Sequence, residues 1–114
     1  MTTEDIARVA HETLRAYSGT LGEYSQAAWQ DAEQWVRQSK IDGVEAVLGG
    51  ATPRQLHTAW CESRETAGWV YGPRLSYPER THPCLVPYND LSVDQRRKDT
   101  LFSAVVKALV KEIR

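Results

Sequence analysis

The clearest structural signal in the chain is the stretch SVDQRRKDTLFSAVVKALVKEI, which spans residues 92–113. Ser92 and Gln95 have the spacing of a capping box, in which side chains satisfy the free backbone N–H groups at the start of a helix. Apolar residues then recur every three or four positions, which places them on one helix face. This apolar stripe consists of Leu101, Phe102, Val105, Val106, Leu109, Val110 and Ile113. The stretch predicts a helix over 93–113 that is the buried spine of the domain, with Leu109 in the core.

Three more helices are predicted upstream. Residues 4–17 and 34–48 carry apolar side chains at helical spacing, although Gly43 weakens the second helix by about 1 kcal/mol relative to alanine. A third helix should cover 53–67, because Thr52-Pro53 supplies the residue types preferred at a helix cap and first turn.

The segment between the last two helices is different, since residues 69–91 are rich in proline and glycine and lack a helical period. Two short apolar runs within it, residues 69–72 and 84–86, predict the strands of a small ribbon. The expected fold is therefore mainly α with a small β ribbon, in one domain over residues 1–114.

Composition excludes several classes of protein. Fourteen Lys and Arg residues against fifteen Asp and Glu residues give a net charge of −1, so binding to nucleic acid through a basic field is not expected. No apolar run approaches the roughly 20 residues of a membrane span, and the acidic start of the chain is unlike a signal peptide. We expect a cytoplasmic protein without a membrane partner.

The aromatic residues are mostly amphipathic, with four Trp and five Tyr but one Phe. Trp and Tyr suit positions with one apolar and one wet side, such as interfaces and the walls of ligand sites. The alternative is that they are half-exposed lids of a small core.

The cysteines and histidines allow one metal hypothesis. His57, Cys61, His82 and Cys84 could in principle form a four-ligand zinc site. The second pair lies only two residues apart and flanks Pro83, which is not a usual zinc spacing. We therefore expect two free thiols, no metal and no cofactor.

Catalytic motifs are missing from the sequence: it has no nucleophile elbow, no phosphate-binding glycine loop and no metalloprotease pair. Cys61 with His57 one turn earlier lacks an orienting third group. The chain is therefore not expected to be an enzyme.

Binding chemistry is better represented. His57, Trp60 and Arg64 share one face of the predicted third helix. An indole stacks on a planar base, whereas imidazole and guanidinium groups donate to phosphate or ribose oxygens. The alternative is that Trp60 simply anchors its helix in the core.

Three motifs together resemble the ryanodine receptor repeat, the RyR domain. They are His57-x-x-Trp60, Gly68-Trp69-x-Tyr71-Gly72-Pro73 and His82-Pro83-Cys84-Leu85-Val86. The opening Ile6-Ala7-x-x-x-His11-Glu12 and the late Asp99 are similar to single-repeat versions found in bacteria and phages. Two features depart from the family: the loop 74–80 lacks its usual aspartate, and Ser92 replaces its usual proline.

The resemblance implies a helical fold and a capacity to bind adenine nucleotides, without enzymatic activity. By position it places Trp60 next to the ligand with His57 and Asp99. Because family members in calcium-release channels occur as tandem pairs, a single repeat is expected to form a two-fold homodimer. In a phage-encoded protein, the location would be the host cytoplasm.

The function predicted from the sequence is a stand-alone module that senses or sequesters a nucleotide-like small molecule without chemistry. The predicted ligand-binding residues are His57, Trp60, Arg64, Tyr71, Arg74 and Asp99. The alternative function is a structural adaptor that docks a partner protein through its aromatic surface.

Overall fold

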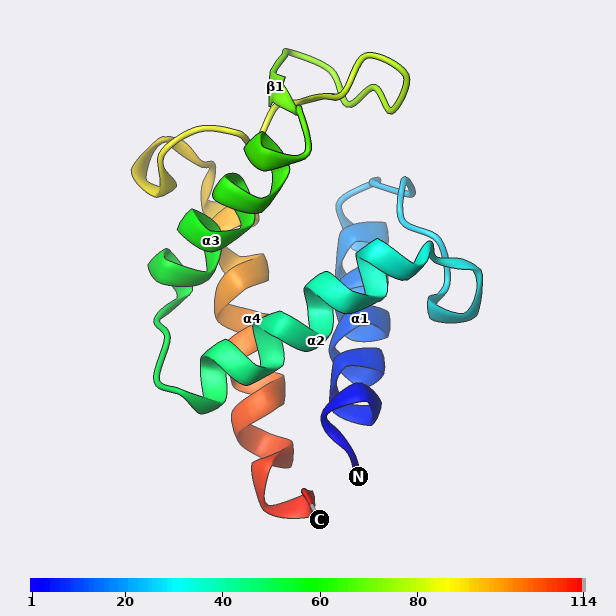
Figure 1. Cartoon of the computed structure of the whole chain (residues 1–114), viewed down its shortest axis with the longest axis vertical. Coiled ribbons are helices and arrows are strands. Elements are labelled where there is room, and N and C mark those ends of the chain that lie inside the picture. Colours follow the sequence, from blue (N-terminus) through cyan, green and yellow to red (C-terminus); the bar gives the residue numbers. More distant parts are fainter. Residues whose placement is uncertain (114) are drawn as a thin grey trace.

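Four α-helices build the protein in the computed structural model, which describes residues 1–113 (Figure 1). They are α1 (Thr3–Thr20), α2 (Gln34–Leu48), α3 (Pro53–Thr66) and α4 (Val93–Leu109). Three 3-10 turns, η1 (Trp29–Asp31), η2 (Tyr88–Asp90) and η3 (Val110–Glu112), lie between or after them. Two short strands, β1 (Val70–Tyr71) and β2 (Thr81–His82), complete the fold, so the mainly α prediction is confirmed.

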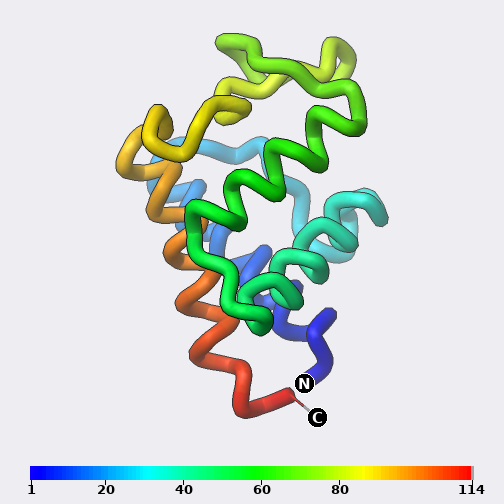
Figure 2. The backbone as a smooth tube through the Cα atoms, turned by 60° about the vertical axis from the view of Figure 1, so that its left-hand side comes forward, coloured from blue at the N-terminus to red at the C-terminus, as the bar shows by residue number. Residues whose placement is uncertain are grey.

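Helices α1 and α4 run antiparallel, so the two ends of the chain lie at the same end of the domain (Figure 1). Helix α2 crosses both of them. The amino group of Met1 donates to the carbonyl oxygen of Glu112 at 2.7 Å. Between these three helices lies one apolar core, formed by Ile6, Ala7, Ala10, Leu14, Trp29, Val44, Val47, Phe102 and Val106. Helix α3 lies obliquely outside them, and the chain after it folds over the end of the domain away from the termini (Figure 2).

The prediction that α4 is the buried spine is only partly right. Helix α1 contributes more buried residues than α4, including Ile6 and His11, and α4 ends at Leu109 rather than at 113. Leu109 is partly buried against the core. The reason is position: α1 is covered by both α2 and α4, whereas the last turns of α4 extend beyond the helices that cover it.

Gly43 has a packing role that its low helix propensity hides. A Cβ atom at this position would lie 3.0 Å from Cζ of Phe102. The missing side chain therefore lets α2 approach the ring of Phe102 closely.

The ribbon forms, but its second strand is not where the sequence predicted it. The two strands are parallel, with Val70 opposite Thr81 and Tyr71 opposite His82. The predicted strand 84–86 is wrong because its backbone makes other bonds: the Val86 carbonyl accepts from the ring of His57.

Among residues 1–113, no helix has the length and apolar character that crossing a membrane requires.

Candidate functional site

A cavity of about 740 Å³ lies where α3 meets the other three helices, and residues from all four helices line it. Its floor is apolar and includes Leu14 and Phe102, which belong to the core. Its walls carry polar groups, among them six charged side chains: Glu23, Lys40, Asp42, Arg64, Lys98 and Asp99. Ligand pockets in proteins usually combine an apolar lining with a few convergent polar groups, and they have volumes of this order.

One wall is aromatic and is centred on Trp60 of α3. The ring of His57 stacks beside the indole, with centroids 5.7 Å apart and an interplanar angle of 23°. The ring of His82 meets the indole edge-on at 4.9 Å. Trp60 is partly buried and lines the cavity, so its ring is held in place but still reachable by a ligand.

Both histidines are held by backbone groups. Nε2 of His57 donates to the carbonyl oxygen of Val86 at 2.7 Å, which fixes the imidazole against the loop before α4. Nδ1 of His82 accepts from the backbone N–H of Cys84 at 3.0 Å, so the proton of a neutral ring resides on Nε2. Burial, together with the charge of Arg64, lowers the pKa of His82 to about 4. His82 is therefore a neutral N–H donor at pH 7.

Arg64 extends the aromatic wall toward α2. Its guanidinium carbon lies 4.5 Å from the ring centre of Trp35 and 5.5 Å from that of Trp60. The side chain is 9% exposed, and it makes no hydrogen bond or ion pair with another residue in the range 1–113. Lys40 of α2 lines the same cavity, and its ammonium lies 6.0 Å from the ring centre of Phe102.

Asp99 of α4 faces the cavity as a partly buried carboxyl group. Burial raises its pKa to about 6, although the nearby side chains of His57 and Lys40 act in the opposite direction. It accepts no hydrogen bond from the described residues. Asp99 is thus an acceptor without a donor inside a polar cavity.

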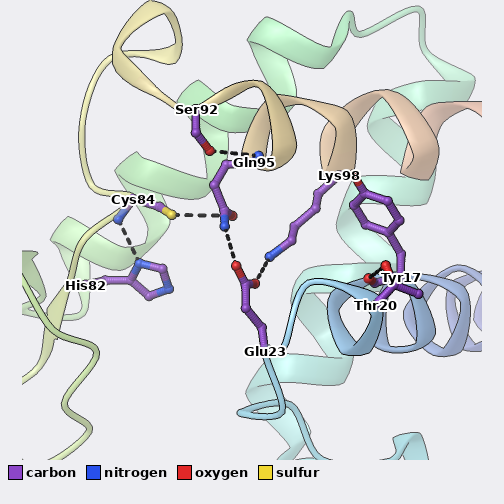
Figure 3. Close-up of polar contacts among 8 residues, drawn as sticks. All are labelled: Tyr17, Thr20, Glu23, His82, Cys84, Ser92, Gln95 and Lys98. Atoms are coloured by element: carbon purple, nitrogen blue, oxygen red, sulfur yellow. Dashed lines mark hydrogen bonds and ion pairs between the residues drawn. The ribbon is translucent and has the colours of Figure 1, made fainter.

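A polar network links Glu23, Cys84, Gln95 and Lys98, all of which line the cavity (Figure 3). The carboxylate of Glu23 accepts from Nε2 of Gln95 at 2.9 Å and from the ammonium of Lys98. Oε1 of Gln95 in turn lies 3.6 Å from the thiol of Cys84. The network joins the segment after α1 to the first turns of α4 and to the loop before it.

The cavity brings together four of the six predicted binding residues: His57, Trp60, Arg64 and Asp99. Tyr71 lies on β1 with 59% of its surface exposed, and Arg74 is exposed in the following loop. Neither of these two residues lines the cavity.

Sequence reasoning missed Glu23, Lys40, His82 and Lys98 as cavity residues. For Lys40 a signal was available, because it lies four residues from Val36 and from Val44 and so interrupts the apolar face of α2. Glu23 lies in the loop after α1, His82 on β2 and Lys98 in the first turns of α4.

The cysteine chemistry does not indicate a reactive centre. Sγ of Cys61 lies 3.3 Å from Nε2 of His57. Burial and the nearby carboxylate of Glu65 raise the pKa of the Cys61 thiol to about 11, so the thiol is protonated at pH 7. Cys61 and Cys84 form no disulfide, and within 1–113 no three His, Cys, Asp or Glu side chains are grouped to hold a metal ion.

A family model described as "RyR domain" matches residues 47–111, which is more than half of the chain. The match extends from the end of α2 through α4. It therefore includes Trp60, Arg64, His82 and Asp99, whereas Glu23 and Lys40 precede it.

Proposed function

The chain belongs to the RyR domain family, and we propose that it is a binding module whose cavity takes up a nucleotide-like small molecule. The observation that carries the proposal is the combination of Trp60, a fixed aromatic wall, with unpaired polar groups in one cavity of about 740 Å³. A base would stack on the indole, while its polar edge and its sugar would reach the donors and acceptors around it.

The donors and acceptors favour a heterocyclic ligand over a plain hydrocarbon. His82 offers an N–H group at the edge of Trp60, and Asp99 offers an acceptor on the facing helix. A purine or similar ring presents both kinds of group at its edge. A hydrocarbon would leave these buried groups unsatisfied, which costs about 1–3 kcal/mol for each.

The proposed role is to sense or sequester the ligand, without a chemical step. The thiol of Cys61, which contacts the cavity residue His57, is protonated at neutral pH because its pKa is about 11. A thiol in that state is a poor nucleophile.

Calorimetric titration with adenosine, adenine mononucleotides and cyclic dinucleotides tests the proposal. Trp60→Ala should weaken binding roughly tenfold to a hundredfold, because stacking on an aromatic ring contributes about 1–3 kcal/mol per base. Tyr71→Ala is the matched control, since this aromatic ring is exposed outside the cavity and its loss should leave affinity unchanged. If folded Trp60→Ala protein binds every tested nucleotide as the parent does, the cavity is not the site.

A second candidate function is an adaptor that docks a partner protein or forms the predicted homodimer. One observation favours it: Val70, Tyr71 and Tyr77 are more than half exposed on the ribbon and its loop. Such apolar surface is typical of interaction sites. Light scattering measures the oligomeric state directly, and Tyr71→Ala should reduce association if this surface is used. A mass of 12.9 kDa in solution would exclude the homodimer.

A further inference from the structure

Two cations face the cavity without an ionic partner of their own. Arg64 is nine-tenths buried, and its guanidinium lies over Trp35 and Trp60 rather than against an acceptor. Within residues 1–113, no carboxylate lies within 4.0 Å of the charged group of Arg64 or of Lys40. Buried guanidinium groups are normally hydrogen-bonded, because they carry five N–H donors. The N–H donors of Arg64 are therefore available to a ligand in the cavity.

The two cations also act on each other. Burial lowers the pKa of Lys40 to about 8, and the next largest cause is the positive charge of Arg64. The negative charge of Asp99 raises the pKa of Lys40, but this effect is smaller than the lowering by Arg64. Repulsion between two partly desolvated cations is a cost in the free protein, and an anion bound between them would remove it.

The remaining charges of the cavity do not neutralise this pair. Lys98 is already engaged by Glu23. Asp42 is exposed at the rim and accepts from Gln38. Among the described carboxylates that line the cavity, Asp99 is therefore the one that no other side chain engages, and Lys40 and Arg64 share it.

We propose that Lys40 and Arg64 form a subsite for a phosphate group, so that the cavity selects nucleoside phosphates over nucleosides. This inference rests on the proposed function, which supplies the stacked base. The guanidinium of Arg64 matches a phosphate with paired N–H donors, and Lys40 adds a point charge from the neighbouring helix. The phosphate then lies at the α2 end of the aromatic wall, next to Trp35 and away from the exposed Arg74.

The test compares adenosine, adenosine monophosphate and pyrophosphate on the full chain at pH 7, by calorimetry and thermal shift. The parent protein should bind the monophosphate at least tenfold more tightly than adenosine. Lys40→Met, which keeps an unbranched side chain of similar size without the charge, should abolish this preference by weakening the binding of the monophosphate more than that of adenosine. Lys107→Met removes an exposed cation of α4 outside the cavity and is the charge-matched control.

A second readout separates a binding role from a structural role. The free Lys40→Met protein should melt at a higher temperature than the parent, because the desolvated cation is gone. If Lys40→Met lowers the melting temperature and weakens both ligands equally, Lys40 is structural and the subsite is wrong.

The outcomes also distinguish this inference from the proposed function. Equal affinity for adenosine and its monophosphate would overturn the subsite and keep the nucleotide-binding function. Stabilisation by pyrophosphate that requires Lys40, with no response to adenosine or its monophosphate, would keep the subsite and overturn the function. No response to any of the three ligands would overturn both.

Discussion

The two ends of the helical domain differ in what fills the space between the helices. At the end that holds the termini, α1, α2 and α4 pack apolar side chains such as Ile6, Val44 and Val106, all of them fully buried (Figure 1). At the other end α3 and the ribbon cover a cavity lined by charges, imidazoles and indoles. The change occurs within a single helix: α4 presents Lys98 and Asp99 to the cavity, Phe102 to both the cavity floor and the core, and Val106 to the core.

The difference shows which end stabilises the protein and which end is available for binding. Apolar burial at the end that holds the termini, the closed end, stabilises the fold by about 25 cal/mol per Å². The unpaired charges at the end that holds the cavity, the open end, instead cost stability, as buried ionisable groups without partners do. Proteins retain such costly groups mainly where function needs them.

The largest expected effect lies at the closed end. Ile6→Ala should lower the free energy of unfolding by about 2–5 kcal/mol, because it leaves a cavity in a tightly packed core. Chemical denaturation measures this loss, and Val110→Ala, an exposed apolar residue, is the control. Trp60→Ala should cost less stability than Ile6→Ala despite its larger side chain. The opposite order would mean that the aromatic wall contributes more to stability than the apolar core between α1, α2 and α4.

Removing a charge at the open end should raise the free energy of unfolding rather than lower it. The pKa of Asp99 rises from 3.8 to about 6 on folding, so its contribution to stability is present below pH 4 and is lost as the pH rises through 6. Asp99→Asn should therefore stabilise the free protein by roughly 1–3 kcal/mol at pH 7 and have little effect at pH 4.

The measurement is the difference between variant and parent in denaturation curves from pH 4 to 8. Taking the difference matters because His82, whose pKa is lowered on folding, contributes the opposite slope in the same range. A variant that is less stable than the parent at pH 7 would show that Asp99 makes a favourable contact.

The boundary between the two ends is tested by glycine substitutions. Gly43→Ala should lower stability by about 1 kcal/mol, because the new Cβ would press on the ring of Phe102. The cost of this contact should exceed the gain in helix propensity. Gly19→Ala is the control, because its Cβ would meet Tyr24 at an ordinary 3.5 Å and should stabilise α1. If both substitutions stabilise the protein in urea denaturation, the ring of Phe102 moves freely.

The smallest effect is expected in the polar network of Glu23, Gln95 and Lys98, which we call the rim network. Glu23→Gln should cost about 0.5–1 kcal/mol, because it weakens a partly buried ion pair with Lys98 but keeps an acceptor for Gln95. Added salt should reduce the difference from the parent. Asp94→Asn, which breaks a more exposed pair with Arg97, should have no measurable effect on thermal stability. Equal losses for the two variants would mean that the rim network has no special role.

Sequence alone determined the features that depend on neighbours within one element. The helix starts at Thr52 and Ser92 follow from their capping residue types, and each side chain accepts from the backbone N–H three positions on. The capping box predicted at Ser92 is only half formed, because the side chain of Gln95 donates to Glu23 instead. The shared face of His57, Trp60 and Arg64 follows from helical periodicity, and all three line the cavity. These interactions span at most two turns, so the local sequence contains all that is needed to predict them.

Tertiary structure alone decided what surrounds those residues. The charge of Arg64 acts on Lys40 of another helix, Glu23 reaches Lys98 over 75 residues, and the second strand pairs at 81–82 rather than at 84–86. Burial and the sign of neighbouring charges arise only when separate elements pack, and they set the pKa values and the free donors of the cavity. The periodicity of the sequence therefore predicts which side chains share a helix face, whereas packing decides whether that face meets a core or a ligand.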